Sequence, residues 1–99
     1  MIEVHGPWIM AHVLAKAQEV PNLTSHRRDE RLTALGQAIR EVRLANNISQ
    51  EALALLSGVD RSYVGRIERG DNNVALLTLH RLAAALSMRP SDLLRAAGL

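Results

Sequence analysis

Residues 49–70 read SQEALALLSGVDRSYVGRIERG, and this stretch decides the fold. Ser49 can cap a helix through its side-chain oxygen, and the residues that follow it favour helix. Gly58 has the backbone freedom that ends this helix, and Asp60 can start a second helix that stops at Gly70. Two short helices joined by a three- or four-residue turn that contains glycine form a helix-turn-helix.

The second of these helices has two different faces. At about 100° per residue, Val64 and Ile67 fall on the apolar side, with Tyr63 and Glu68 at its edges. The opposite side carries Arg61, Ser62, Gly65, Arg66 and Arg69. Arginine can bind a guanine edge through two hydrogen bonds, and it also binds phosphate. A glycine inside a helix costs about 1 kcal/mol relative to alanine, so a close approach to a groove wall is expected in return. The alternative is a solvated polar face with a chance glycine.

The stretch resembles the Cro/CI-type helix-turn-helix of phage repressors and restriction–modification controller proteins. The matching residues are Ser49-Gln50-Glu51, Leu53-Ala54, Gly58, and Tyr63-Val64 through Ile67-Glu68-Arg69-Gly70. The resemblance covers about Leu35–Leu94 and implies an all-α, five-helix, lambda-repressor-like DNA-binding domain. The sequence Asp60-Arg61-Ser62-Tyr63 is most similar to the controller proteins. The family usually carries a small polar residue or proline before its fourth helix, where this chain has Val74-Ala75.

Hydrophobic periodicity predicts the remaining helices of the domain. One runs from about residue 29 to 46, with its apolar positions at Leu32, Leu35, Ala38, Ile39 and Val42. Another covers about 76–86 and should bury Leu76, Leu79, Leu82, Ala83 and Leu86. The last covers about 90–97, with Pro90 in its first turn and with Leu93 and Leu94 directed inward.

The first 28 residues differ from the rest and predict a boundary, with an extension and linker over 1–28 and the domain over 29–99. Pro7 can begin a helix over about Trp8–Glu19, and a polar linker and a basic segment follow it. This helix has apolar residues without a partner. So does the helix beginning at Gln50, where Leu55 and Leu56 point away from the core side. We expect the two apolar surfaces to pack together, within one subunit or between two.

Composition limits the classes of function. The 99 residues are 47% hydrophobic, which suits one small domain, and there is no cysteine to form disulfides or thiolate metal sites. The histidines are scattered, and no phosphate-binding loop, nucleophile motif or acidic pair is present, so we expect no metal, no cofactor and no enzyme activity. No apolar run approaches the ~20 residues of a membrane span, and a cytoplasmic location is expected. Eleven of the twelve basic residues are arginine, a bias that genomic base composition can also produce.

The polar face of the second helix and the family resemblance together predict the DNA-binding residues. We expect Arg61, Ser62 and Arg66 to read bases. Contacts to the DNA backbone are expected from Gln50, Tyr63, Arg69, Asn72 and Asn73. For some of these a structural role is the alternative: Gln50 as an ordinary exposed residue, Tyr63 as packing, and the two asparagines as a turn. The resemblance also implies an internal ion pair between Arg43 and Glu68.

The leading hypothesis is a sequence-specific, double-stranded DNA-binding transcriptional regulator that acts as a homodimer on a two-fold operator. The expected dimer contacts are Leu77, Met88, Leu94 and Leu99. A competing hypothesis is an antitoxin-type or other protein-interaction module whose residues 1–28 bind a partner protein. Use of the fold to bind RNA or a coactivator is a third. The operator, the regulated genes and the choice between activation and repression do not follow from the sequence.

Overall fold

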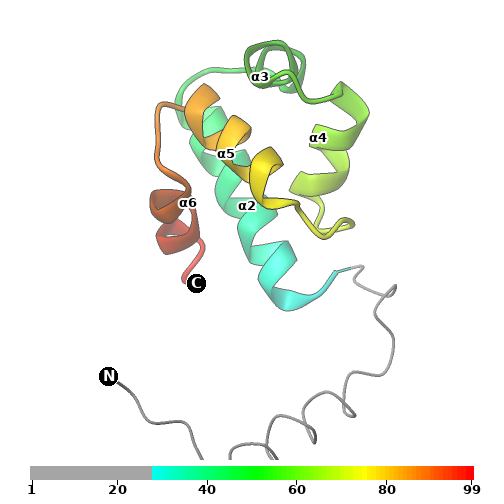
Figure 1. Ribbon diagram of the computed structural model, residues 1–99, viewed down its shortest axis with the longest axis vertical. Helices are drawn as coiled ribbons and strands as arrows, with labels where there is room; N and C mark the ends of the chain where they lie inside the picture. Colours follow the sequence, from blue (N-terminus) through cyan, green and yellow to red (C-terminus); the bar gives the residue numbers. More distant parts are fainter. Residues whose placement is uncertain (1–27) are drawn as a thin grey trace, which may run out of the picture.

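Five helices and no strand make up the part of the chain that the computed structural model describes, residues 28–99 (Figure 1). They are α2 (Glu30–Ala45), α3 (Gln50–Ser57), α4 (Arg61–Glu68), α5 (Leu76–Ala85) and α6 (Pro90–Ala96). The long helix α2 contacts both α4 and α6, which lie on opposite sides of it in Figure 1. The all-α prediction is confirmed, and so are the five helices expected after residue 29.

The helix ends follow from local chemistry. Ser49 accepts a hydrogen bond from the Ala52 N–H at 3.0 Å, and the Asp60 carboxylate accepts one from the Ser62 N–H at 3.1 Å. These side chains pair backbone donors that have no partner inside the first turn of a helix. Gly58 ends α3 with a φ of +72°, in the left-handed region that favours glycine. Helices α3 and α4 are thereby joined by a short turn.

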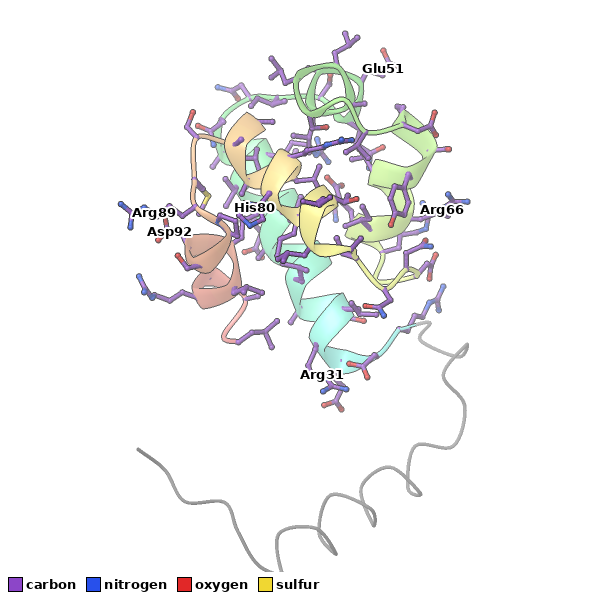
Figure 2. All side chains as sticks on the ribbon, viewed as in Figure 1. Arg31, Glu51, Arg66, His80, Arg89 and Asp92 are labelled. Atoms are coloured by element: carbon purple, nitrogen blue, oxygen red, sulfur yellow. The ribbon has the colours of Figure 1, made fainter. Side chains whose placement is uncertain are left out.

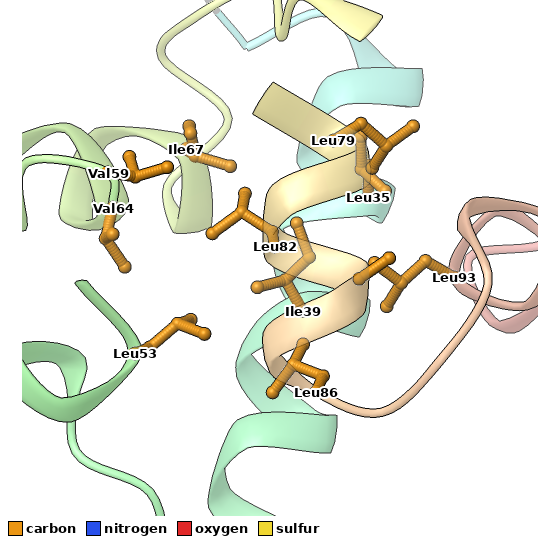
Figure 3. Close-up of a cluster of buried hydrophobic side chains, with 11 residues drawn as sticks. Leu35, Ile39, Leu53, Val59, Val64, Ile67, Leu79, Leu82, Leu86 and Leu93 are labelled. Carbon is orange, nitrogen blue, oxygen red and sulfur yellow. The ribbon is translucent and has the colours of Figure 1, made fainter. Parts of the chain in front are cut away.

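An aliphatic core holds the five helices together (Figure 3). Ile39, Leu53, Leu82 and Leu93 are completely buried, one each from α2, α3, α5 and α6. Burying a leucine side chain contributes about 1.5–3 kcal/mol, which opposes the conformational entropy that the chain loses on folding. The prediction for Leu76 is wrong: its side chain is 66% exposed. The core members from α5 begin only at Leu79, so the first turn of the helix extends beyond the core.

Two glycines bring α2 and the end of α4 close together. A Cβ atom on Gly36 would lie 2.2 Å from the Ile67 carbonyl oxygen and 2.7 Å from that of Glu68. Gly70, with a φ of +79°, lies against Thr33, whose Oγ1 would be 2.7 Å from an added Cβ. At Gly36 the backbone of α2 therefore approaches the backbone of α4 without an intervening side chain.

The predicted N-terminal helix lies outside the described residues, together with the apolar surface that it was expected to contribute. The other half of that prediction is visible, since Leu55 is 85% exposed and Leu56 is 63% exposed on α3. Within residues 28–99, no helix has both the length and the hydrophobicity needed to cross a membrane.

Candidate DNA interface

Helix α4 exposes its polar side and buries its apolar side, as the sequence predicts. Val64 and Ile67 are each 1% exposed and belong to the core. The exposed side chains of the helix and its C-cap are Arg61, Ser62, Arg66 and Arg69. Figure 2 shows Arg66 directed away from the domain on the outer side of α4. This exposed face holds three guanidinium groups and one hydroxyl group.

A buried ion pair fixes α4 to α2. Arg43 Nε lies 2.6 Å from Glu68 Oε2, and Arg43 Nη2 donates to Glu68 Oε1 at 3.0 Å. Both residues are 7% exposed, so the two charges depend on each other for stabilisation. Arg43 Nη1 also donates to the Ile48 carbonyl oxygen at 3.0 Å, which ties the α2–α3 loop to the same network.

Gln50 connects the first helix of the motif to the second. Its Nε2 donates to Glu68 Oε1 at 2.9 Å, across the turn between α3 and α4. The Glu68 carboxylate therefore accepts three hydrogen bonds, from two residues on two other helices. Gln50 is half-buried in this network rather than an ordinary exposed residue. A second hydrogen on its amide nitrogen remains for another acceptor, so its contact with phosphate stays a prediction.

The first turn of α4 carries a second set of contacts. The Ser62 hydroxyl donates to Asp60 Oδ2, which also accepts from the Ser62 N–H. The hydroxyl hydrogen bond is the largest cause that lowers the pKa of Asp60, and the N–H groups of Ser62 and Tyr63 add to it. The Arg66 guanidinium lies 5.5 Å from the centre of the Tyr63 ring, a cation–π distance. Tyr63 is half-buried and packs against the core, so the packing alternative is present and its phosphate contact stays a prediction.

No packing contact in the described chain demands a glycine at position 65. An added Cβ would meet only the mobile ends of side chains, with Arg69 Nη1 nearest at 3.4 Å and Arg61 Nη1 at 3.6 Å. This glycine differs from Gly36, which faces backbone atoms. The expectation that Gly65 allows close approach to a groove wall therefore remains, as a prediction.

The loop after α4 brings together residues that the sequence does not show to be neighbours. Asp71 accepts from Arg69 Nε at 3.1 Å and from Arg28 Nε at 3.4 Å. The Arg28 N–H also donates to the Gly70 carbonyl oxygen at 2.7 Å, so residue 28 is attached to the end of α4. Asn72 is half-buried, and its Oδ1 accepts no hydrogen bond from residues 28–99, while Asn73 is exposed.

A polar depression of about 240 Å³ lies between α2, α3 and α4. It is lined by Gln37, Arg40, Arg43, Gln50, Gly65, Glu68 and Arg69. Sequence reasoning did not identify Gln37 and Arg40, although their three-residue spacing from Arg43 places them on one side of α2. With three arginines and one glutamate, the lining is positive overall. It adjoins the exposed face of α4.

The described residues contain no cluster of three or more histidine, cysteine or acidic side chains that could hold a metal ion. His80, the one histidine within residues 28–99, is exposed on α5. The polar groups of the candidate site are thus the arginine, amide and hydroxyl side chains around α4.

Comparison with known proteins agrees with this geometry. Residues 39–93 match the helix-turn-helix family. The chain is 46% identical over 65 residues to control protein C.SmaI of Serratia marcescens, covering 66% of this chain and 77% of that protein. It is 43% identical over 60 residues to control protein C.BamHI of Bacillus amyloliquefaciens, covering 60% and 74%. The crystal structure of the restriction–modification controller protein C.AhdI from Aeromonas hydrophila superposes with a TM-score of 0.64 at 51% identity, over 66% of this chain and 98% of that one. The chain therefore belongs to the helix-turn-helix family, as a DNA-binding transcriptional regulator of the XRE type related to restriction–modification controller proteins.

Proposed function

We propose that the protein binds a two-fold operator in double-stranded DNA as a homodimer, with α4 in the major groove. The observation that carries this proposal is the division of α4 into two sides. Val64, Ile67 and the paired Glu68 hold the helix on the domain, and Arg61 and Arg66 extend from it into solvent. A B-DNA major groove admits an α-helix and displays a different pattern of donors and acceptors for each base pair.

In this proposal Arg61, Ser62 and Arg66 read bases. Both arginines are exposed and carry donors only, which suit the O6 and N7 acceptors of guanine. The Tyr63 ring beneath the Arg66 guanidinium limits the directions that this long side chain can take. A side chain that is already partly held in place loses less conformational entropy when it binds a base.

The remaining site residues surround this face and would contact the DNA backbone. Gln50 lies at the N-terminus of α3, where helix geometry favours anions, and its amide keeps a free hydrogen. Arg69 is held by Asp71 at the other end of α4. Tyr63, Asn72 and Asn73 complete the proposed set. These contacts would set the register of α4 on the duplex and carry no base information.

A homodimer follows from the small size of the reading surface, because one eight-residue helix contacts too few base pairs to be selective. Two copies would read half-sites about one turn apart, ~34 Å or 10–10.5 bp. Apolar side chains at the start of α5 and at the C-terminus support an interface there, since Leu76, Leu77 and Leu99 are 66%, 72% and 52% exposed. Met88 and Leu94 are half-buried beside the core and complete the expected contact set.

The test is selection of bound sites from random duplex DNA at fixed salt, followed by affinity measurements. We expect an enriched two-fold sequence. Arg61→Ala and Arg66→Ala should each lose about 1–3 kcal/mol of binding free energy and relax the preference at one or two positions. Gln50→Ala should weaken binding to all sequences alike. Arg81→Ala is the matched control, because it removes the same charge from an exposed position on α5.

Failure to enrich any sequence, or equal binding to RNA and duplex DNA, would contradict the proposal. Equal losses on selected and random DNA for the two arginine variants would assign Arg61 and Arg66 to phosphate instead. Sedimentation that shows a monomer at tens of micromolar, with no dimer on DNA, would refute the homodimer.

A further inference from the structure

The hydroxyl group of Ser62 has its only proton engaged. Its Oγ donates to Asp60 Oδ2, and the Ser62 N–H donates to the same oxygen at 3.1 Å. A serine hydroxyl has one donor hydrogen and two acceptor lone pairs. With the hydrogen directed at Asp60, the exposed oxygen presents only lone pairs to a binding partner.

The direction of this hydrogen bond follows from Asp60 Oδ2, which accepts from the Ser62 N–H and offers the hydroxyl only lone pairs. The pKa of this carboxyl is lowered, first by the Ser62 hydroxyl and also by the backbone N–H groups of Ser62 and Tyr63. The carboxylate also caps the N-terminus of α4, where the helix dipole favours a negative charge. An ionised carboxylate has no proton to give, so Ser62 must be the donor.

We propose that Asp60 makes Ser62 an acceptor-only reader, which selects an exocyclic amino group on the major-groove edge of the operator. The inference rests on the proposed function, in which α4 enters the major groove. Only two bases offer such a donor there: adenine through N6 and cytosine through N4. Guanine offers N7 and O6, and thymine offers O4, so either base would set lone pair against lone pair. Asp60 is then a specificity-determining residue that acts through Ser62.

This assignment gives the reading face both kinds of hydrogen-bonding group. Arg61 and Arg66 on either side can only donate. Every base pair presents one amino group in the major groove, on adenine or on cytosine. The Ser62 oxygen therefore determines which strand carries the amino group at its own position, and it accepts from adenine as well as from cytosine, whereas the arginines favour guanine.

The experiment compares sites selected from random duplex DNA by the full-length protein and by variants. The Ser62 position is defined as the half-site position whose base preference changes in Ser62→Ala. We expect the wild type to favour there the two base pairs that carry the amino group on the same strand, A·T and C·G, by about 5- to 150-fold over T·A and G·C, the usual range for one mismatched pair. Asp60→Gly keeps most of the helix cap but frees the hydroxyl to donate. Its preference at that position should fall towards equality, with the rest of the site unchanged.

Two further variants serve as controls. Ser49→Gly makes the matching cap change on α3, where the side chain accepts only from the Ala52 N–H, and it should leave the preference at the Ser62 position intact. Asp60→Asn keeps an acceptor oxygen for the hydroxyl and removes the charge, so it should retain the preference. Folding of each variant is checked by thermal melting.

Three results would overturn the inference: equal preference at the Ser62 position for base pairs that carry the amino group on either strand, an unchanged preference in Asp60→Gly, or a lost preference in Asp60→Asn. No change in preference at any position in Ser62→Ala would also overturn it, because Ser62 would then read no base. A wild type that enriches no sequence at all would instead refute the proposed function. The two failures are therefore distinguishable.

Discussion

Gly36→Ala and Gly65→Ala make the same chemical change in the interiors of two helices, and the structure predicts opposite effects on stability. At Gly65 the new methyl group would meet only side-chain ends, the guanidinium groups of Arg69 and Arg61 at 3.4 and 3.6 Å and Gln50 Oε1 at 3.9 Å. At Gly36 it would lie 2.2 Å from the Ile67 carbonyl oxygen and 2.7 Å from the Glu68 carbonyl oxygen. Side-chain ends can move aside, whereas backbone oxygens of a packed helix cannot.

The magnitudes follow from two contributions. Replacing glycine by alanine within a helix stabilises it by about 1 kcal/mol at either position. Relieving the overlap at Gly36 requires α2 and α4 to separate by about 1 Å, and overpacking of this kind costs about 3 kcal/mol at the upper end of its usual range. We therefore expect Gly36→Ala to be about 2 kcal/mol less stable than the wild type and Gly65→Ala about 1 kcal/mol more stable.

Urea unfolding at several protein concentrations measures both effects, because the concentration series separates folding from any association. The propensity contribution is common to the two variants, so their difference of about 3 kcal/mol reports the α2–α4 contact. If the unfolding free energies of the two variants agree within about 0.5 kcal/mol, the scatter of neutral substitutions, Gly36 does not set the close approach of α2 to α4. Operator affinity is a second readout, since close approach of Gly65 to the groove predicts that the more stable variant binds DNA more weakly.

Four other predictions concern separate features. Glu68→Gln should lower the free energy of unfolding by about 3 kcal/mol, because Arg43 stays buried without its charged partner, and an unchanged urea midpoint would contradict this. The pKa of Asp60 is lowered in the folded state, so its stabilising contribution is present above about pH 4 and is lost as the pH falls through the folded-state pKa. Asp60→Asn should therefore flatten the dependence of the unfolding free energy on pH in acid. Matching pH profiles for the variant and the wild type would be evidence against this. Leu77→Glu should sediment as a monomer at tens of micromolar, and a persisting dimer would move the interface elsewhere. A chain that starts at Arg28, and so keeps the contacts of this residue with Gly70 and Asp71, should melt at a lower temperature and lose monodispersity if the preceding segment covers the exposed Leu55. Unchanged melting would show that the segment is a free arm or a partner-binding tail.

The helix boundaries were predictable because their causes are local. Ser49 and Asp60 bond to N–H groups two or three residues away, and Gly58 ends its helix through its own backbone angle. The buried side of each helix was predictable from periodicity. Leu76 shows the limit of that argument: spacing tells which side of a helix faces the core, but not how far along the helix the core extends.

Contacts between distant segments were not predictable in the same way. Gly36 is a helix glycine like Gly65, and only the packing of α2 on α4 shows that one faces backbone and the other faces side-chain ends. Asp71 lies next to a loop in the sequence, yet it binds arginines from two parts of the chain. The ion pair between Arg43 and Glu68 came from family resemblance, since no spacing relates residues on separate helices. Base contacts depend on the duplex and remain predictions.

The two-sided arrangement of α4 has a consequence for how such regulators diversify. Val64, Ile67 and Glu68 hold the helix in place, and Arg61 and Arg66 contribute nothing to the core. Exposed substitutions usually change stability by no more than about 0.5 kcal/mol, so a duplicated gene can acquire a new target by changing a few outward residues while its product still folds. The same separation makes the domain a suitable scaffold for laboratory libraries, in which outward positions are randomised and the inward positions are left untouched.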